Sequence, residues 1–331
     1  EKLPLAHKNC HMLFREAAQL ARDAGTKRLL LTHFSCDSIH ETLPECRLYV
    51  DFRYDYNMEF ADVFAGRVDR IDVFIFDKDG KFILQKNEQG ERLAAGNYRM
   101  PLDLPLGEYR ISAWGGMSDD FEMPRLVVGQ STPEDLTVKM NREATLIYDK
   151  ELHPLWYGEP ITVNFTGRGE QTETVRLVKD TNKFRFILQN LGPGLALDPD
   201  DCLFEIHADN GHCNWDNSLL ADDVISYRPY YLADVDDIGL VVEMNTMRLL
   251  ENKKVYFMLT RKSNGERLFK VDLIPYLLLT KMEGHNIPAQ EYLDRQSEYA
   301  LVFFYNSELI SFLAAKIVIN GWTIWLKNED L

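Results

Sequence analysis

The stretch Arg47-Leu48-Tyr49-Val50-Asp51-Phe52-Arg53-Tyr54 decides the fold, because apolar residues occupy every second position along it. Successive side chains of a β-strand point to opposite faces, so this period of two predicts a strand with one buried face. A fully buried aliphatic side chain contributes roughly 1.5–3 kcal/mol. A one-residue slip would lose several such contributions at once, so the register is well specified.

The next predicted strand runs from Val68 to Phe76 and ends at a tight-turn sequence, Asp77-Lys78-Asp79-Gly80. Its apolar residues fall on both faces. Ile71, Val73 and Ile75 lie on one face, and Phe74 and Phe76 lie on the other. We therefore expect both faces of this strand to be covered.

The remainder of the chain predicts many short strands separated by Gly, Pro, Asn and Asp, which is typical of β-sandwiches. A helix is expected near Ala289 to Tyr292, and two strands, Lys316 to Asn320 and Trp322 to Leu326, close the chain. We place the domain boundary near His153-Pro154, giving domains at 36–155 and 156–331. The fold class is all-β, with two β-sandwich domains in tandem. The other strands are expected at 81–85, 106–114, 136–140, 144–148, 161–165, 174–178, 183–189, 203–207, 238–243, 254–260, 270–274 and 299–305.

Residues 1–35 do not follow this pattern. Small and apolar residues recur at helical spacing from Met12 to Ala24, and Leu29 to Phe34 is typical of a short buried strand. We expect a short helix–strand segment before the two sandwiches.

Composition excludes several classes of protein. The 37 basic and 52 acidic residues give a net charge of −15, which disfavours nucleic acid as a partner. Nothing approaches the ~20 consecutive apolar residues of a membrane-spanning helix. The eight histidines lack the spacing of a zinc hydrolase, and phosphate-loop, Gly-x-Ser-x-Gly and Cys-x-x-Cys motifs are absent. We therefore predict a non-enzymatic protein without a metal or a cofactor.

One polar cluster, between Cys202 and Asn217, offers thiol, imidazole and carboxylate groups that are competent metal ligands. The favoured alternative is a hairpin turn at Asp209-Asn210-Gly211, with Cys202 and Cys213 bridged across it if the protein is exported. The Asp77 turn lacks the terminal glutamate of a calcium loop.

Aromatic residues near the predicted domain boundary also have two interpretations. Trp156, Tyr157 and the cluster Tyr227, Tyr230 and Tyr231 could stack on sugars or on a partner. We favour packing between the two sandwiches.

From Cys36 onward the chain resembles the FimB-type minor fimbrial subunits, the cell-anchored subunits of type V fimbriae. The resemblance covers nearly all of 36–331 and rests on the order and spacing of several stretches. These are Tyr54-Asp55-Tyr56-Asn57-Met58 with Ala61-Asp62, Val68 to Asp77, Gly107-Glu108-Tyr109 with Ala113-Trp114-Gly115-Gly116, Tyr227-Arg228-Pro229-Tyr230-Tyr231, Leu259-Thr260-Arg261, and Tyr292-Leu293-Asp294-Arg295-Gln296 with Glu298-Tyr299.

The resemblance implies two transthyretin-like sandwiches and a lipoprotein of the outer membrane. Cys36 stands where the acylated cysteine of the family belongs, and two acyl chains would hold the protein stably at a bilayer. The implied partners are other fimbrial subunits, joined by strand complementation, and the outer membrane. This localisation requires that the native gene supply a signal peptide.

Residues 1–35 instead resemble the carboxyl-terminal end of ribonuclease Z, with His33 at a metal-ligand position. The other ligands of that enzyme, including its His-x-His-x-Asp-His motif, are absent from this sequence. We therefore expect two unrelated sequences to join near Ser35, by gene fusion or assembly error.

Three functional hypotheses follow. The first is a fimbrial anchor subunit that assembles by strand addition, with the terminal strand as the exchanged element because Trp322, Ile324 and Leu326 form one apolar face. The second is a glycan-binding surface adhesin, for which Trp156 and Trp215 are the candidate sugar platforms. The third is a zinc-dependent nuclease based on the first 35 residues.

Overall fold

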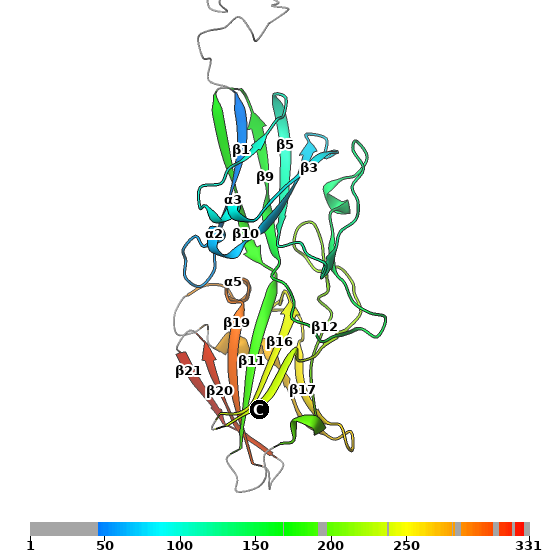
Figure 1. Ribbon diagram of the computed structural model, residues 1–331, viewed down its shortest axis with the longest axis vertical. Helices are drawn as coiled ribbons and strands as arrows, with labels where there is room; N and C mark the ends of the chain where they lie inside the picture. The colour runs from blue at the N-terminus through cyan, green and yellow to red at the C-terminus, as the bar shows by residue number, and fades with distance from the viewer. Residues whose placement is uncertain are drawn as a thin grey trace, which may run out of the picture.

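The protein consists of two β-sheet lobes stacked end to end, as a computed structural model shows (Figure 1). The structure describes residues 46–327 except 168, 191–196, 237, 280, 282–285, 307–310 and 320–321. The segment 1–35 and Cys36 lie outside the described residues. The all-β prediction is confirmed, because strands build both lobes and the described helices are short.

The first lobe is one seven-stranded sheet in the order β3-β2-β5-β9-β10-β1-β4. All neighbouring pairs are antiparallel except β1 with β10, which run parallel. Two one-turn helices lie beside it, α2 (Phe64–Arg67) and α3 (Glu91–Ala94). The strands are β1 (Arg47–Tyr56), β2 (Arg70–Asp77), β3 (Phe82–Gln89), β4 (Met100–Leu102), β5 (Gly107–Gly115), β9 (Trp156–Phe165) and β10 (Glu170–Lys179).

The sheet of the first lobe folds over on itself around one apolar core. Leu48, Val50, Phe52 and Tyr54 of β1 are buried in the same cluster as Ile71, Val73 and Ile75 of β2, although β1 and β2 do not pair. The period-two alternation of β1 therefore buries one face of the strand, as the sequence predicts. The opposite face of β2 is covered as well, because Phe74 and Phe76 belong to a second core shared with the other lobe.

The second lobe is a sandwich of two larger sheets. One has the order β15-β16-β11-β19-β20-β21 and the other β18-β17-β12-β14-β8. The strands are β8 (Ile147–Tyr148), β11 (Thr181–Asn190), β12 (Cys202–Ala208), β14 (Ile225–Tyr227), β15 (Tyr231–Val235), β16 (Gly239–Met247), β17 (Tyr256–Arg261), β18 (Arg267–Asp272), β19 (Glu298–Asn306), β20 (Ser311–Ile319) and β21 (Trp322–Lys327).

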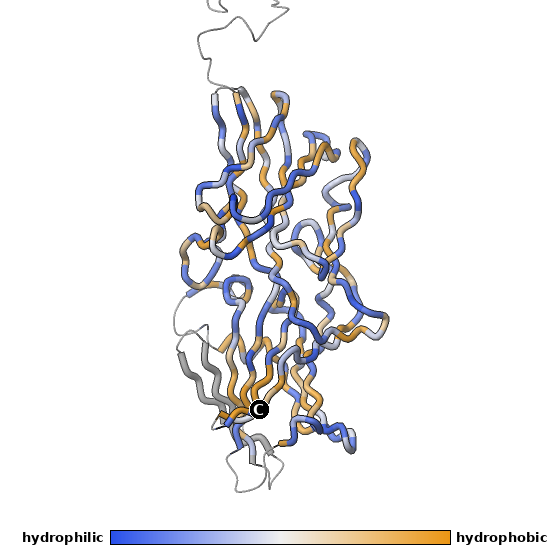
Figure 2. The backbone as a smooth tube through the Cα atoms, in the orientation of Figure 1, coloured by the Kyte–Doolittle hydropathy of each residue, from blue (hydrophilic) through white to orange (hydrophobic). Residues whose placement is uncertain are grey.

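Aromatic side chains join the two sheets of the second lobe. Phe186 of β11 stacks on Phe257 of β17 with ring centroids 3.9 Å apart, and Phe303 of β19 lies 5.8 Å from Phe257. Such rings bury large apolar areas, so these contacts stabilise the packing of one sheet on the other. Figure 2 shows the corresponding hydrophobic stretches along the strands of the lower lobe.

The predicted domain boundary at 155/156 is wrong for the sheets. β9 and β10 belong to the first sheet, and β10 continues into β11 through the single residue Asp180. The Gly and Pro residues near position 155 lie instead where the chain returns to the first sheet. Between β5 and β9 the chain pairs with strands of the second lobe: β8 pairs with β14, while β6 (Phe121–Glu122) and β7 (Val138–Met140) form a small sheet with β13 (His212–Cys213).

Two helices complete the second lobe. α5 (Ala289–Arg295) confirms the predicted helix, whereas α4 (Leu273–Leu279) begins inside the predicted strand 270–274. Two 3-10 turns, at Pro133–Asp135 and Pro199–Asp201, precede β7 and β12. No helix of the described residues is long and apolar enough to span a bilayer.

Candidate functional site

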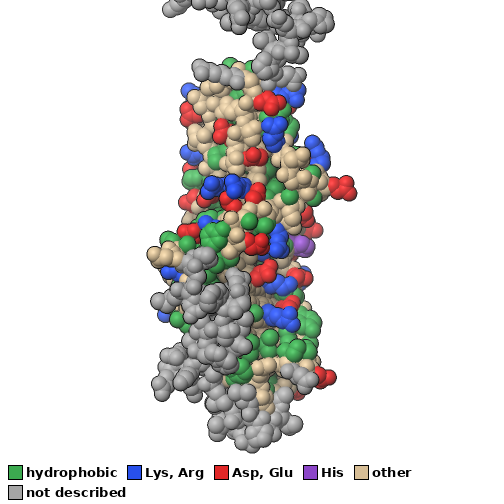
Figure 3. Space-filling view, turned by 90° about the vertical axis from the view of Figure 1, so that its left-hand side faces the viewer, with side chains coloured by type: hydrophobic (Ala, Val, Ile, Leu, Met, Phe, Trp, Pro, Cys, Tyr) green, Lys and Arg blue, Asp and Glu red, His purple; other side chains and the backbone are tan. Residues whose placement is uncertain are grey.

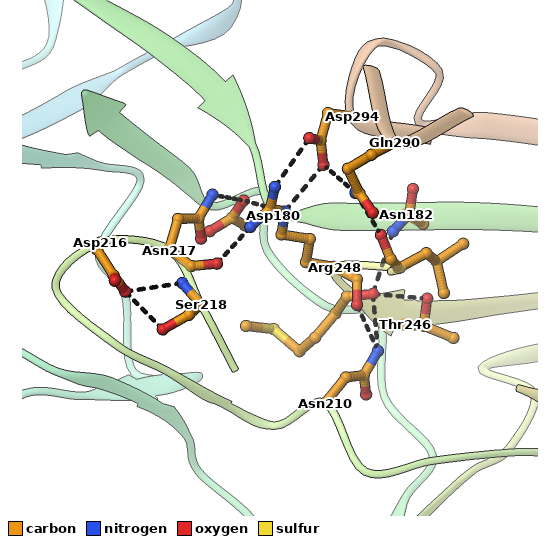
Figure 4. Close-up of polar contacts among 12 residues, drawn as sticks. Asp180, Asn182, Asn210, Asp216, Asn217, Ser218, Thr246, Arg248, Gln290 and Asp294 are labelled. Atoms are coloured by element: carbon orange, nitrogen blue, oxygen red, sulfur yellow. Dashed lines mark hydrogen bonds and ion pairs between the residues drawn. The ribbon is translucent and has the colours of Figure 1, made fainter. Parts of the chain in front are cut away.

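A buried polar network occupies the junction between the two lobes (Figure 4). Its centre is Arg248, which directly follows β16, since Met247 is the last residue of that strand. The Arg248 guanidinium donates to both carboxylate oxygens of Asp294 on α5, at 2.8 Å each, and to the backbone carbonyl of Asn217. Gln290, one turn earlier on α5, donates to the same carboxylate at 2.9 Å. One side chain thus links β16, α5 and the loop after β13.

Asp180, the residue between β10 and β11, is the second carboxylate of this network. It is fully buried, accepts a hydrogen bond from Asn217 Nδ2 at 3.0 Å, and lies 3.9 Å from Arg248 Nε. Its Oδ2 has no hydrogen-bond partner among the described residues. Burial raises the pKa of Asp180 to about 7 against the opposing effects of Arg248 and Asn217, with Asp294 adding to the rise.

A second contact between the lobes is made by Arg295, the last residue of α5. Its guanidinium donates to the backbone carbonyls of Asp55 and Asn57, at 3.1 and 3.2 Å. It also lies over the rings of Tyr56 and Phe60. α5 belongs to the second lobe and sits between the lobes (Figure 1), so it holds the end of β1 directly.

A cleft of about 510 Å³ opens beside this junction. Its cationic lining includes Arg67 at the end of α2 and Lys179 at the end of β10, neither of which has an ion pair among the described residues. Lys179 Nζ donates to the Ser297 hydroxyl at 3.3 Å, and its burial lowers the pKa of the ammonium. Lys183, by contrast, is paired with Glu151 at 3.3 Å.

Trp156 forms part of the wall of this cleft but does not offer a ring to solvent. Its side chain is only 3% exposed, and its ring meets that of Tyr54 edge-on at 6.1 Å. Burial raises the pKa of Tyr54 to about 12, partly offset by Trp156. The expectation that Trp156 is a sugar platform is therefore wrong. Packing between the lobes is confirmed for Tyr157, which belongs to the core that both lobes share, whereas Trp156 packs within the core of the first lobe.

The remaining candidate aromatics divide between core and surface. Tyr227 is fully buried and donates to Asn210 at 2.7 Å. Trp215 is half-buried, with the Arg110 guanidinium 5.8 Å from its ring. Tyr231 is 46% exposed on β15.

The predicted hairpin with its disulfide is not formed. β12 and β13 belong to different sheets, because the chain leaves β12 and crosses to pair with β7. Cys202 and Cys213 are free buried thiols. Asn210, at the predicted turn, is instead buried and donates to the carbonyls of Met247 and Arg248. No group of three or more potential metal ligands occurs in the described part of the chain.

The predicted exchange strand forms the border of a sheet. β21, which contains Trp322, Ile324 and Leu326, pairs antiparallel with β20 from Ile319↔Trp322 to Ala314↔Lys327. Within the described residues it has no neighbour on its other side.

Residues 43–328 match the family model of the fimbrillin-A associated anchor proteins Mfa1 and Mfa2. The chain belongs to this family. The minor fimbrium anchoring subunit Mfa2 of Porphyromonas gingivalis is 24% identical over 301 residues, covering 88% of this chain and 90% of that protein. The resemblance to anchor-type minor fimbrial subunits is thereby confirmed.

Solved structures of similar proteins share the fold of this Mfa2-family chain. A proposed polysaccharide-binding protein of Bacteroides thetaiotaomicron is 47% identical with a TM-score of 0.82, covering 87% of this chain and all 100% of its own. A proposed adhesin of Bacteroides ovatus is 32% identical with a TM-score of 0.76, covering 89% and 99%. The fimbrial anchor protein Mfa2 of P. gingivalis has a TM-score of 0.65 at 20% identity, covering 85% and 99%.

The junction network of this Mfa2-family chain was not predicted from the sequence. Asp180, Arg248 and Asp294 lie in three distant segments, and no spacing joins them. Of these three residues, only Asp294 falls within a stretch that carried the family resemblance.

Proposed function

We propose that this protein is a non-enzymatic subunit that anchors fimbriae at the outer membrane and joins its neighbours by β-strand complementation. Membership of the Mfa2 family is the observation that carries this proposal. In such complementation, main-chain hydrogen bonds supply affinity and alternating side chains supply specificity. Attachment would use the lipid on Cys36, given a signal peptide in the native gene.

β21 is the element that we propose for exchange. It has one neighbour among the described residues, so its release breaks a single ladder with β20. The edge of β20 thereby exposed would accept a partner strand, or β21 itself would be donated. Unpaired edges invite aggregation, so this border has to be filled in the assembled fimbria.

Deletion of 322–331 tests the assembly proposal, with deletion of 328–331 as the matched control that leaves β21 intact. We expect the larger deletion to keep its β-sheet circular dichroism and to lose incorporation into fimbriae. Retained incorporation would contradict the proposal. Unfolding of the variant would show that β21 is an integral strand, which also contradicts exchange.

The lipid anchor has its own test in the native gene. Replacing Cys36 by Ser removes the only thiol to which we assign acylation. We expect loss of labelling by radioactive palmitate and release of the protein from the outer membrane, whereas Cys46→Ser should change neither. Unchanged labelling of the Cys36 variant would overturn the anchor.

A second candidate function is glycan binding. The relative that is 47% identical is described as a proposed polysaccharide-binding protein, and the junction offers a cleft of a size suited to a small ligand. A glycan array probed with the purified protein tests it. Binding to no glycan would remove this function and leave the fimbrial role in place.

A further inference from the structure

We propose that the junction cleft binds an acidic sugar, whose carboxylate is held by Arg67 and Lys179. This inference rests on the glycan-binding function above and assigns to it a site and a class of ligand. The cleft is bounded by the end of α2, the end of β10 and the start of β19, so both lobes contribute to it.

The two cations are the first part of the argument. Lys179 is half-buried, and its Nζ donates one hydrogen bond among the described residues, at 3.3 Å to the neutral Ser297 hydroxyl. Withdrawing an ammonium from water is costly unless hydrogen bonds and opposite charge compensate for it. Arg67, at the end of α2, is exposed and forms no ion pair among the described residues. A carboxylate placed between them would gain charge-assisted hydrogen bonds from both.

The charge balance favours a monoanion. Arg67 and Lys179 together supply two positive charges, and Glu298, which lines the same cleft, supplies one negative charge. Glu298 is near enough to oppose the loss of the Lys179 charge. Lys183 and Glu151 also line the cleft but neutralise each other. The remaining charge of +1 matches a carboxylate and suits a phosphate dianion less well.

The size and the walls fit a sugar. The cleft volume of about 510 Å³ lies within the roughly 300–1,000 Å³ typical of small-molecule sites. Pro154 and Trp156 give it an apolar side, and Thr181 and Asn182 give it a polar side. A second cleft of about 610 Å³ shares Arg67, His153, Pro154 and Trp156 with the first. An oligosaccharide therefore has room to extend past His153 from one cleft into the other.

Acidic and basic side chains are interspersed over the described part of the face shown in Figure 3.

Calorimetric titration with glucuronate tests the proposal, with glucose and acetate as matched probes that lack the carboxylate and the sugar respectively. We expect glucuronate to bind more tightly than either. Arg67→Gln and Lys179→Met should each weaken glucuronate binding by about tenfold or more, because each removes a charge-assisted contact. Arg125→Gln and Lys254→Met, exposed cations outside the cleft lining, should leave it unchanged.

Glu298→Gln supplies a test with the opposite sign. Removing this exposed carboxylate should tighten glucuronate binding by about two- to fivefold, an effect that damage to the fold could not produce. It therefore keeps the proposal testable even if Lys179→Met misfolds.

Two results would overturn the site. Equal binding of glucose and glucuronate would exclude the carboxylate contact, and equal binding of acetate and glucuronate would exclude the sugar. Glycan binding on the array with glucuronate affinity unchanged in Arg67→Gln and Glu298→Gln would reject this site while the glycan-binding function stands. No binding of glycans or glucuronate would reject both.

Discussion

The guanidinium of Arg295 on α5 lies 4.1 Å from the ring centroid of Tyr56 at the end of β1. The two residues belong to different lobes, and the same guanidinium donates to the carbonyls of Asp55 and Asn57. Cation–π contacts and charge-assisted hydrogen bonds are strongest where water is excluded, and the Arg295 side chain is 12% exposed. The lobes are thus fixed to each other by directional contacts as well as by the shared apolar core.

Replacing Arg295 by Ala should weaken this contact and destabilise the protein by about 1–3 kcal/mol. Lys should rescue only part of the loss, because an ammonium cannot match the planar geometry of the guanidinium. Chemical denaturation measures the change. Arg125→Ala, at an exposed position without a described contact, is the control, and an equal loss in that variant would argue against a clamp.

Arg248→Met should have a larger effect than Arg295→Ala. Removing the guanidinium leaves the buried carboxylates of Asp180 and Asp294 without their shared partner, and breaking a buried pair in this way typically costs about 3–5 kcal/mol.

A double variant measures the coupling between Arg248 and Asp294 separately from their other contacts. Combining Arg248→Met with Asp294→Asn should recover part of the lost stability, because one of the two orphaned charges is then absent. Additive losses in the urea denaturation of the three variants would show that Arg248 and Asp294 are not coupled.

The features predicted from sequence are those that local pattern encodes. Alternation in β1 and the two-faced pattern of β2 predicted which side chains meet in the first core. The boundary near His153-Pro154 is wrong because the glycine and proline that follow, Gly158 and Pro160, do not interrupt the sheet. Gly158 instead lies inside β9, where an added Cβ would come within 2.8 Å of Val175, so the strand needs a glycine for close packing.

Features that depend on distant segments were not predictable. α4 contains Leu273-Ile274-Pro275-Tyr276-Leu277, an apolar run with neither a helical nor a strand period. The cleft joins Arg67, Lys179 and Glu298 from three separate elements. No single window of sequence brings such groups together, because the pairing of β1 with β10 and of β11 with β19 does so.

The stability should depend on pH through Asp180. Burial raises the folded-state pKa of this carboxyl from 3.8 to about 7, so the protonated form favours folding. Its contribution, up to about 4 kcal/mol, is complete below pH 4 and is lost as the pH rises to 7. Asp180→Asn mimics the protonated form, so the variant should gain stability relative to the parent as the pH rises from 4 to 7. Urea denaturation at pH 4.5, 5.5 and 7 measures this difference, and parallel profiles would exclude Asp180 as its source.

Glu205 should make the stability depend on pH in the opposite direction from Asp180, and at more acidic pH. A hydrogen bond from His207 and, against the effect of burial, bonds from Ser226 and Arg228 lower its pKa from 4.5 to about 2. The stability that these contacts provide is present above pH 4.5 and is lost as the pH falls to 2. Glu205→Gln should therefore flatten the acid limb of the stability profile and leave the range from 5 to 7 unchanged.

Gly116 tests how tightly the segment after β5 packs against the segment before β9, where the chain runs between the lobes. It follows β5 with φ +75°, and a Cβ at this position would lie 2.1 Å from the backbone oxygen of Pro154. Gly129 has a similar φ of +72° with nothing within 4 Å of the added atom, so it serves as a control for the conformational strain alone. Gly129→Ala should cost about 1 kcal/mol, whereas Gly116→Ala adds a backbone clash and should cost several kcal/mol or prevent folding. Equal thermal shifts for the two variants would show that the 113–118 and 153–156 segments do not pack as described.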